Sequence, residues 1–145
     1  IKTLTSTFDK KTVGLDVTDE AVIIASLLER ETATDEEKPI VAGILYKRIK
    51  NDWPLQVDAT LQYIKGDWKP VYFEDKELKS PFNTYKHLGP PPSPISNPGL
   101  SSILAAISPE ESDYWYYIHD NDAKIHFAKT LEEHNSNIRK YLLTQ

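Results

Sequence analysis

The fold of this chain is decided by residues 18–31, which read TDEAVIIASLLERE. Thr18 is a favourable N-cap, and the two acidic residues after it lie in the first turn, where the helix dipole favours negative charge. Residues 21–28 are apolar except for Ser26, so a helix formed here has apolar side chains on most of its surface. We therefore expect a mostly buried helix with a charged C-terminal end.

The whole chain has the length and composition of one compact domain. It contains 145 residues, of which 39% are hydrophobic and 27% charged, and such a composition folds rather than remaining disordered. Its net charge of -5 disfavours attraction to nucleic acid, so we expect no nucleic-acid partner. The complete absence of cysteine excludes thiol nucleophiles, disulfides and cysteine-based metal sites.

The start of the chain predicts that it belongs to something longer. The sequence begins at Ile1 and contains no methionine, and none of its apolar runs approaches the ~20 residues of a membrane span. We expect a processed product or a piece of a longer protein, with any signal peptide or anchor outside this sequence.

Elements after the first helix are indicated by capping signals and periodicity. They are a helix from about Asp35 to Lys50, a short helix over Leu100–Ile107, a hairpin of residues 114–119 and 124–128, and a closing helix from near Thr130. The stretch Gly89–Gly99 holds five of the ten prolines, which excludes a helix or a central strand there. N-terminal helices, a late β-hairpin and a C-terminal helix, without regular βαβ alternation, predict an α+β fold.

Glu31 is the strongest candidate for chemistry. On a helical period it shares a face with Ile24, Leu27 and Leu28, so it continues an apolar stripe. Such surroundings raise the pKa of a carboxyl group, and a glutamic acid that stays protonated near neutral pH can protonate a leaving oxygen. A helix-end carboxylate turned back into water is the alternative. We expect Glu29, on the same helix, to be solvated or paired with arginine.

Two further stretches carry groups suited to a ligand with many hydroxyls. In residues 55–60, LQVDAT, the polar residues Gln56, Asp58 and Thr60 alternate with apolar ones and are expected to project to one side as a row of hydrogen-bonding groups. An ordinary amphipathic strand, or a turn at Asp58, is the alternative. Residues 81–85, PFNTY, offer an amide, a hydroxyl and two aromatic rings on a stiff loop, as the wall of a sugar-binding cleft would. Structural packing of Phe82 and Tyr85 is the alternative.

Histidines give a weaker signal. His119, His126 and His134 together with Asp120 do not have the spacing of a metal site, so we expect no metal and no cofactor. Hydrogen bonding or packing is the expected role of these side chains. Motifs for nucleotide binding and for a serine nucleophile are also missing from the sequence.

Three blocks of this sequence occur in an order that resembles the MltG (YceG-like) family of endolytic murein transglycosylases. They are residues 25–32 (ASLLERET), 55–60 (LQVDAT) and 82–85 (FNTY), followed by LGPP at 88–91 and NPG at 97–99. The likeness covers nearly the whole chain from about Val13. It implies that residues 1–145 are the catalytic domain of a longer parent, without its membrane anchor and LysM-like region.

The resemblance also implies an activity and its residues. Glu31 matches the family's catalytic acid, which cleaves the bond between MurNAc and GlcNAc of peptidoglycan without water and then acts as the base that completes a 1,6-anhydro end. Gln56, Asp58, Asn83 and Tyr85 match family motif positions and are predicted to line the substrate cleft. The alternative function is a non-catalytic peptidoglycan-binding or scaffolding module.

The setting of the protein follows from the same resemblance. Peptidoglycan glycan strands are the expected partner, and cell-wall synthesis proteins are candidate partners of the parent. The parent is expected to be a single-pass protein at the outer face of the bacterial cytoplasmic membrane, and this fragment of it to be soluble.

Overall fold

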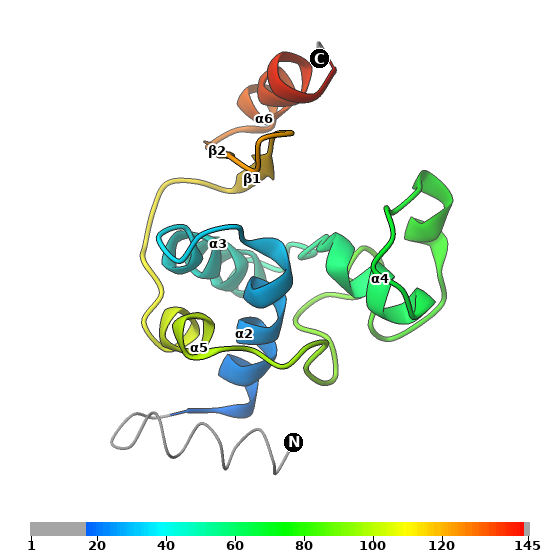
Figure 1. The fold of residues 1–145 in the computed structure, drawn as a ribbon, viewed down its shortest axis with the longest axis vertical. Helices are drawn as coiled ribbons and strands as arrows, with labels where there is room; N and C mark the ends of the chain where they lie inside the picture. Colours follow the sequence, from blue (N-terminus) through cyan, green and yellow to red (C-terminus); the bar gives the residue numbers. More distant parts are fainter. Residues whose placement is uncertain (1–16, 144–145) are drawn as a thin grey trace.

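The structure is a computed structural model that describes residues 17–143 (Figure 1). Its elements, in chain order, are α2 (Asp19–Glu31), α3 (Lys38–Lys50), α4 (Asp58–Lys65), the 3-10 helix η1 (Phe73–Glu77), α5 (Leu100–Ile107), β1 (Tyr116–His119), β2 (Ile125–Ala128), α6 (Leu131–Ile138) and the π-helix η2 (Arg139–Leu143). The predicted α+β fold is confirmed. The first 16 residues of the expected domain and residues 144–145 lie outside the described part.

Helix α2 begins as its sequence predicts. The Thr18 hydroxyl oxygen accepts a hydrogen bond from the Ala21 amide at 3.1 Å, which satisfies one of the backbone donors that a helix start leaves open. Ile24, Leu27 and Leu28 are fully buried, because α2, α3 and α5 pack on one another and form the core (Figure 1).

Helix α3 starts three residues later than predicted, at Lys38. The Glu37 carboxylate turns back and accepts hydrogen bonds from the Ala33 amide at 2.8 Å and the Thr34 hydroxyl at 3.0 Å. Residues 35–37 therefore form a turn. Pro39, in the first turn of α3, suits a helix start because it has no amide hydrogen to offer.

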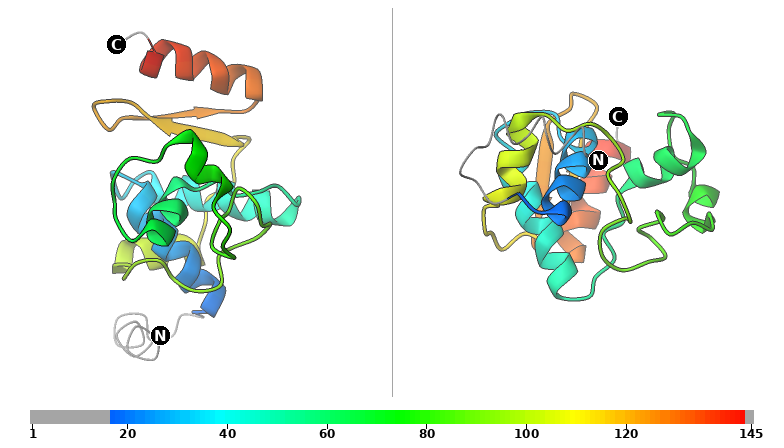
Figure 2. Two further views of the ribbon diagram at one scale, coloured as in Figure 1. Left: turned by 90° about the vertical axis from the view of Figure 1, so that its right-hand side faces the viewer. Right: turned by 90° about the horizontal axis from the view of Figure 1, so that it is seen from below.

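Two lobes project from this helical body, and Figure 2 shows them on different sides of it. The α4 lobe comprises residues 58–86 with α4 and η1, and the hairpin lobe comprises residues 115–143 with β1, β2, α6 and η2. In the hairpin lobe β1 pairs antiparallel with β2, with Tyr117 opposite Phe127, and α6 packs on both strands. The predicted hairpin and closing helix are thus confirmed.

The row predicted for residues 55–60 is wrong. Asp58 starts helix α4, which ends at Gly66 in the left-handed conformation, with φ 81°. Thr60 consequently turns inward: it is fully buried, and its hydroxyl donates to the Val57 carbonyl at 2.7 Å. Only Gln56 and Asp58 remain available to a ligand.

No helix in residues 17–143 has the length and apolar character needed to cross a bilayer.

Candidate active site

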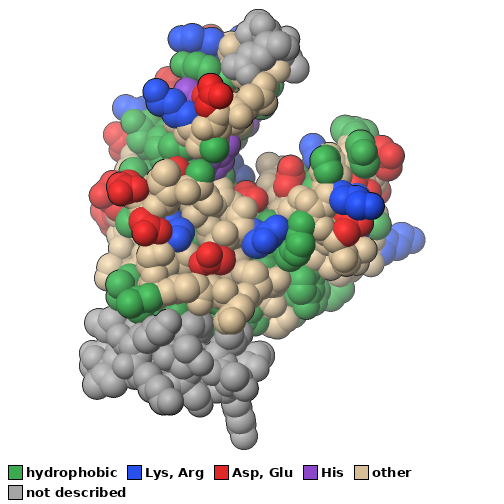
Figure 3. Space-filling model, in the orientation of Figure 1, with side chains coloured by type: hydrophobic (Ala, Val, Ile, Leu, Met, Phe, Trp, Pro, Cys, Tyr) green, Lys and Arg blue, Asp and Glu red, His purple; other side chains and the backbone are tan. Residues whose placement is uncertain are grey.

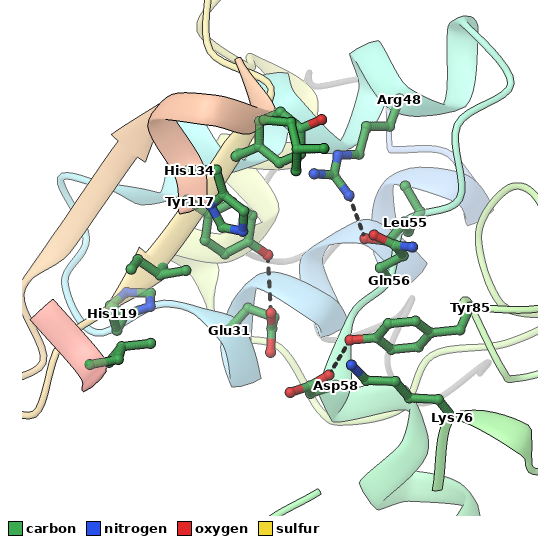
Figure 4. A pocket seen from close by; sticks show the side chains of 14 residues that line it. Glu31, Arg48, Leu55, Gln56, Asp58, Lys76, Tyr85, Tyr117, His119 and His134 are labelled. Atoms are coloured by element: carbon green, nitrogen blue, oxygen red, sulfur yellow. Dashed lines mark hydrogen bonds between the residues drawn. The ribbon is translucent and has the colours of Figure 1, made fainter. Parts of the chain in front are cut away.

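The surface is hollowed between the two lobes (Figure 3), and this cleft holds a cavity of about 600 Å³. The end of α2 and the start of α4 form its floor. The hairpin lobe forms one wall, and η1 with the loop that follows forms the other. The side chains that line the cavity include Glu31, Gln56, Asp58, Lys76, Tyr85 and Tyr117 (Figure 4).

Glu31 is the last residue of α2, and its carboxyl group faces this cavity (Figure 4). Burial raises its pKa to about 7, and the charge of Asp58 adds to the effect. Hydrogen bonding from Tyr117, whose hydroxyl donates to Glu31 Oε1 at 3.0 Å, opposes the rise in pKa. The apolar stripe predicted this environment, and the carboxyl group does not turn away into water.

Tyr117 is a site residue that the sequence did not single out. It reaches Glu31 from β1, 86 residues along the chain. Burial and the neighbouring Glu31 raise the pKa of Tyr117 well above its usual value, so its hydroxyl remains protonated and remains a donor. The only sequence signal for it is the aromatic composition of β1, which says nothing about what the strand faces.

Gln56 lines the cavity from a segment that is held on both sides. Its backbone is left-handed, with φ 53°, a conformation that non-glycine residues adopt at a cost. Arg48 Nη1 donates to the Leu55 carbonyl at 3.1 Å, the Gln56 amide donates to the Thr84 carbonyl at 3.2 Å, and the Val57 amide donates to Thr84 Oγ1 at 2.9 Å. These contacts fix the backbone conformation of Gln56 at the edge of the cavity.

Asp58 and Tyr85 face each other across the floor, and the Tyr85 hydroxyl donates to the Asp58 carboxylate (Figure 4). Asn83, predicted to line the same cleft, does not reach the cavity. It is fully buried, its amide nitrogen donates to the carbonyls of Lys76 at 3.1 Å and Leu78 at 2.8 Å, and its Oδ1 accepts from the Tyr85 amide at 2.9 Å. Asn83 therefore braces the wall that carries Lys76 and Tyr85, and we correct its predicted place to this one.

Glu29 belongs to the other side of α2. It accepts hydrogen bonds from the Gly99 amide and the Ser102 hydroxyl, both at 2.9 Å, and the first of these is the main reason why its pKa is lowered. Its side chain is exposed, as expected, but it holds the start of α5 and is not paired with arginine. Glu29 is thus not a competitor for the role of acid in the cleft.

The histidines do not converge on one point. His119 and His134 line the cavity, but His119 pairs with Glu37, whereas His126 pairs with Asp120 at 2.8 Å. Within residues 17–143 no group of three or more His, Cys, Asp or Glu side chains is arranged to hold a metal ion. These residues shape the hairpin lobe and the cavity wall.

A second, smaller cavity of about 200 Å³ also has Glu31 in its lining. Arg30, Ala33 and Ala123 contribute to its lining, and it shares Glu31 and His119 with the larger cavity. The two cavities therefore adjoin each other at Glu31.

Comparisons with known proteins find close relatives over most of the chain. An endolytic murein transglycosylase of Bacillus subtilis (strain 168) is 41% identical over 120 residues, which are 82% of this chain and 33% of that protein. An endolytic murein transglycosylase of Streptococcus pneumoniae (serotype 2, strain D39) is 31% identical over 131 residues, which are 86% of this chain and 24% of that protein.

A solved structure shares the fold. The crystal structure of a YceG-like protein from Listeria monocytogenes matches with a TM-score of 0.79 and 37% sequence identity, over 94% of this chain and 44% of that chain. This chain spans only 33% and 24% of the two curated relatives. The model of the YceG-like family matches residues 1–140, and the chain therefore belongs to the YceG-like family.

Proposed function

We propose that this chain carries the active site of an endolytic peptidoglycan lytic transglycosylase, which cleaves the glycosidic bond between MurNAc and GlcNAc. One observation carries the proposal: a single glutamic acid with a pKa of about 7 faces the cleft. The names of the curated relatives support the reaction class.

Glu31 has the properties that both halves of this reaction need. The protonated carboxyl group gives its proton to the glycosidic oxygen, the bond from that oxygen to C1 of MurNAc breaks, and positive charge develops at C1. The 6-hydroxyl oxygen of the same MurNAc then bonds to C1, and its proton passes to the Glu31 carboxylate. The products are a 1,6-anhydro end and a free GlcNAc hydroxyl, and no water is consumed.

The pKa of Glu31 suits this exchange of roles. With a value of about 7, both the protonated and the ionised form are populated at neutral pH, so the group can act as acid and then as base. Tyr117 holds Oε1 at 3.0 Å and fixes the direction of the carboxyl group toward the cleft. We assign Tyr117 as a positioning residue, because it acts through Glu31.

Three predicted substrate-binding residues line the same cavity as Glu31. Gln56, Asp58 and Tyr85 offer an amide, a carboxylate and a phenol to the cavity, which suits the hydroxyl and acetamido groups of a glycan. In this proposal Asn83 contributes indirectly, by holding the loop that carries Tyr85.

Product analysis tests the proposal. We expect mass spectrometry of peptidoglycan strands digested with this protein to show new 1,6-anhydro-MurNAc ends. Glu31→Gln keeps the shape of the side chain but has no transferable proton, and we expect it to form no product. Glu29→Gln is the matched control on the same helix and should retain activity, since Glu29 faces α5.

Other products would contradict the proposal in distinct ways. Reducing MurNAc ends in place of anhydro ends would indicate a hydrolase. Turnover by Glu31→Gln would remove Glu31 from the reaction. Strand binding without any product would favour the non-catalytic peptidoglycan-binding module instead.

A further inference from the structure

The wall of the cleft formed by η1 contains a cationic and aromatic group that the proposed reaction does not use. Lys76 lines the large cavity, and its Nζ lies 5.1 Å from the centroid of the Tyr85 ring and 5.7 Å from that of Phe73. The Phe73 ring is 83% exposed. An exposed aromatic ring beside an ammonium group is suited to a ligand that is apolar on one side and anionic on the other.

The charge of Lys76 is not neutralised within the described part of the chain. None of the carboxylates described lies within 4.0 Å of its Nζ, although acidic residues surround it in sequence. Asp75 pairs with Lys65 and Glu77 pairs with Lys86, each at 2.9 Å. Asp58, the acidic residue on the cavity floor, accepts a hydrogen bond from the Tyr85 hydroxyl. The ammonium group of Lys76 therefore faces the cleft without an ion pair.

The aromatic rings also restrict where this ammonium group lies. A lysine side chain in solution samples many rotamers, and fixing it costs entropy. Contacts with the faces of Tyr85 and Phe73 favour conformers that keep the charge at the cavity wall. The backbone carbonyl of Lys76, which accepts from Asn83 at 3.1 Å, fixes the main chain independently of the side chain.

We propose that Lys76 and Phe73 form a subsite that binds a carboxylate-bearing part of the glycan strand. This inference rests on the proposed function, because that function supplies the ligand. Muramic acid carries a lactyl group, whose carboxylate is free on strands without peptides and is amide-linked on strands with peptide stems, where the peptide supplies carboxylates instead. A lysine ammonium binds a carboxylate as a point charge. Phe73 covers an apolar face next to that carboxylate.

Binding measurements with four kinds of strand test this subsite. Glu31→Gln protein is used throughout, so that strands are not cut, with Lys76→Met as the variant that keeps an apolar stem against the rings without the charge. The strands are stem-bearing, stem-free, and the same two with their carboxyl groups methyl-esterified. We expect Lys76→Met to raise the Kd about tenfold on strands with free carboxylates and to leave the Kd for esterified strands unchanged.

Two control variants separate charge from packing. Lys76→Arg keeps the charge and should stay within about twofold of the parent protein in Kd. Lys79→Met removes an exposed lysine that does not line the cavity and should have no effect. The loss in Lys76→Met should also shrink as salt is added, because the contact is ionic.

The strands distinguish the two sources of the carboxylate. A loss confined to stem-bearing strands assigns the peptide stem, and a loss confined to stem-free strands assigns the lactyl group. Equal losses on esterified strands, or no loss on any strand, would overturn the subsite. The subsite and the proposed activity can fail separately. If wild-type protein cuts strands but Lys76→Met does not change the Kd, only the subsite is wrong. If Lys76→Met raises the Kd but wild-type protein forms no product, only the proposed activity is wrong.

Discussion

Glu31 lies where an ionised carboxylate is unfavourable for two reasons. It ends helix α2, where the helix dipole repels negative charge, and burial raises its pKa to about 7. Tyr117 offsets part of this cost with one hydrogen bond at 3.0 Å. The protein thus keeps a carboxyl group that destabilises the fold when it ionises, as expected for a residue retained for chemistry.

This cost gives a prediction that does not depend on activity. Because the folded-state pKa of about 7 exceeds the usual glutamate value, the folded protein binds more protons than the unfolded chain between these values. Its stability therefore falls as pH rises through that range. Residue 31 does not titrate in Glu31→Gln, so the free energy of unfolding of this variant minus that of wild type should be larger at pH 8 than at pH 5, by about 2 kcal/mol.

Urea denaturation followed by circular dichroism, with both proteins at both pH values, measures this difference. Glu29→Gln serves as the control, and we expect its difference from wild type to be nearly the same at both pH values, because hydrogen bonds lower the pKa of Glu29 and keep it ionised throughout this range. A difference between Glu31→Gln and wild type that is the same at pH 5 and pH 8 would show that the Glu31 carboxyl titrates normally.

For single residues, the sequence was informative where one face of a helix determined the surroundings of a side chain. The apolar stripe indicated surroundings that raise the pKa of Glu31, because its members lie on consecutive turns of one helix, and the pKa is raised to about 7. Tyr117 could not be predicted, since its contact with Glu31 spans 86 residues and depends on how the hairpin lobe packs. Asn83 carried the right chemistry for a ligand, but the loop uses its amide for its own backbone.

At the scale of elements, the segment that follows α5 packs very closely against helix α3. The Glu110 amide donates to the Pro39 carbonyl at 3.0 Å. A Cβ atom at Gly43 would lie 2.0 Å from the Glu110 carbonyl oxygen, which is far inside contact distance. Only glycine allows this crossing, which leads the chain from α5 to the hairpin lobe.

We therefore predict that Gly43→Ala destabilises the fold, although alanine is the better helix former. Helix propensity favours alanine by about 1 kcal/mol, but backbone displacement of this kind costs about 1–3 kcal/mol or more, so we expect a net loss of about 2 kcal/mol. The shift of the denaturant midpoint relative to wild type measures this loss of stability.

Gly66→Ala is the comparison: a Cβ atom there meets nothing within 4 Å, and only the positive φ of this residue should cost about 1 kcal/mol. An unchanged or higher midpoint for Gly43→Ala would contradict the crossing.

Helix α4 shows why alternation misleads in a short segment. Polar and apolar residues alternate over residues 55–60 as in a strand, but Gln56 is left-handed, with φ 53°, and α4 begins at Asp58, directly after the extended Val57. Gly66 and the acidic first residue are the helix signals that were available. What could not be read locally is that Thr60 bonds to Thr84 at 3.0 Å inside the protein, which joins two of the blocks that resemble the family.

The whole molecule is arranged so that one side chain ties both lobes to the body. Arg48 is 7% exposed, and it donates from Nε and Nη2 to the Trp115 carbonyl at 3.0 and 2.7 Å, and from Nη1 to the Leu55 carbonyl at 3.1 Å. The first contact is at the first residue of the hairpin lobe, and the second lies just before the α4 lobe. The Arg30 guanidinium, at the end of α2, lies 3.7 Å from the ring centroid of Trp68 in the α4 lobe. These contacts join both lobes to the helical body.

A cleft held in this way predicts where strands are cut. The cavities of about 600 Å³ and about 200 Å³ share Glu31. We expect a strand to run from one cavity into the other past this acid, so that it need not present an end. We expect the early products from long strands to be shortened strands of many lengths, which chromatography resolves by size. Accumulation of disaccharides from the start would contradict a cleft open on both sides.

Blocking one side of the cleft tests the same point. Ala33 is exposed and lines the smaller cavity, and its amide is held by Glu37 at 2.8 Å, so a larger side chain can project there without moving the backbone. Ala33→Trp should leave the strand room on one side of Glu31 only. We therefore expect Ala33→Trp to suppress the early products of many lengths and to confine residual cutting to strand ends. Ala33→Ser, which adds little volume, should behave as wild type.

The lining of the larger cavity is unchanged in Ala33→Trp. A loss of internal cuts alone therefore identifies the smaller cavity as the path of the strand. An unchanged product distribution would show that the strand leaves the cleft by another route.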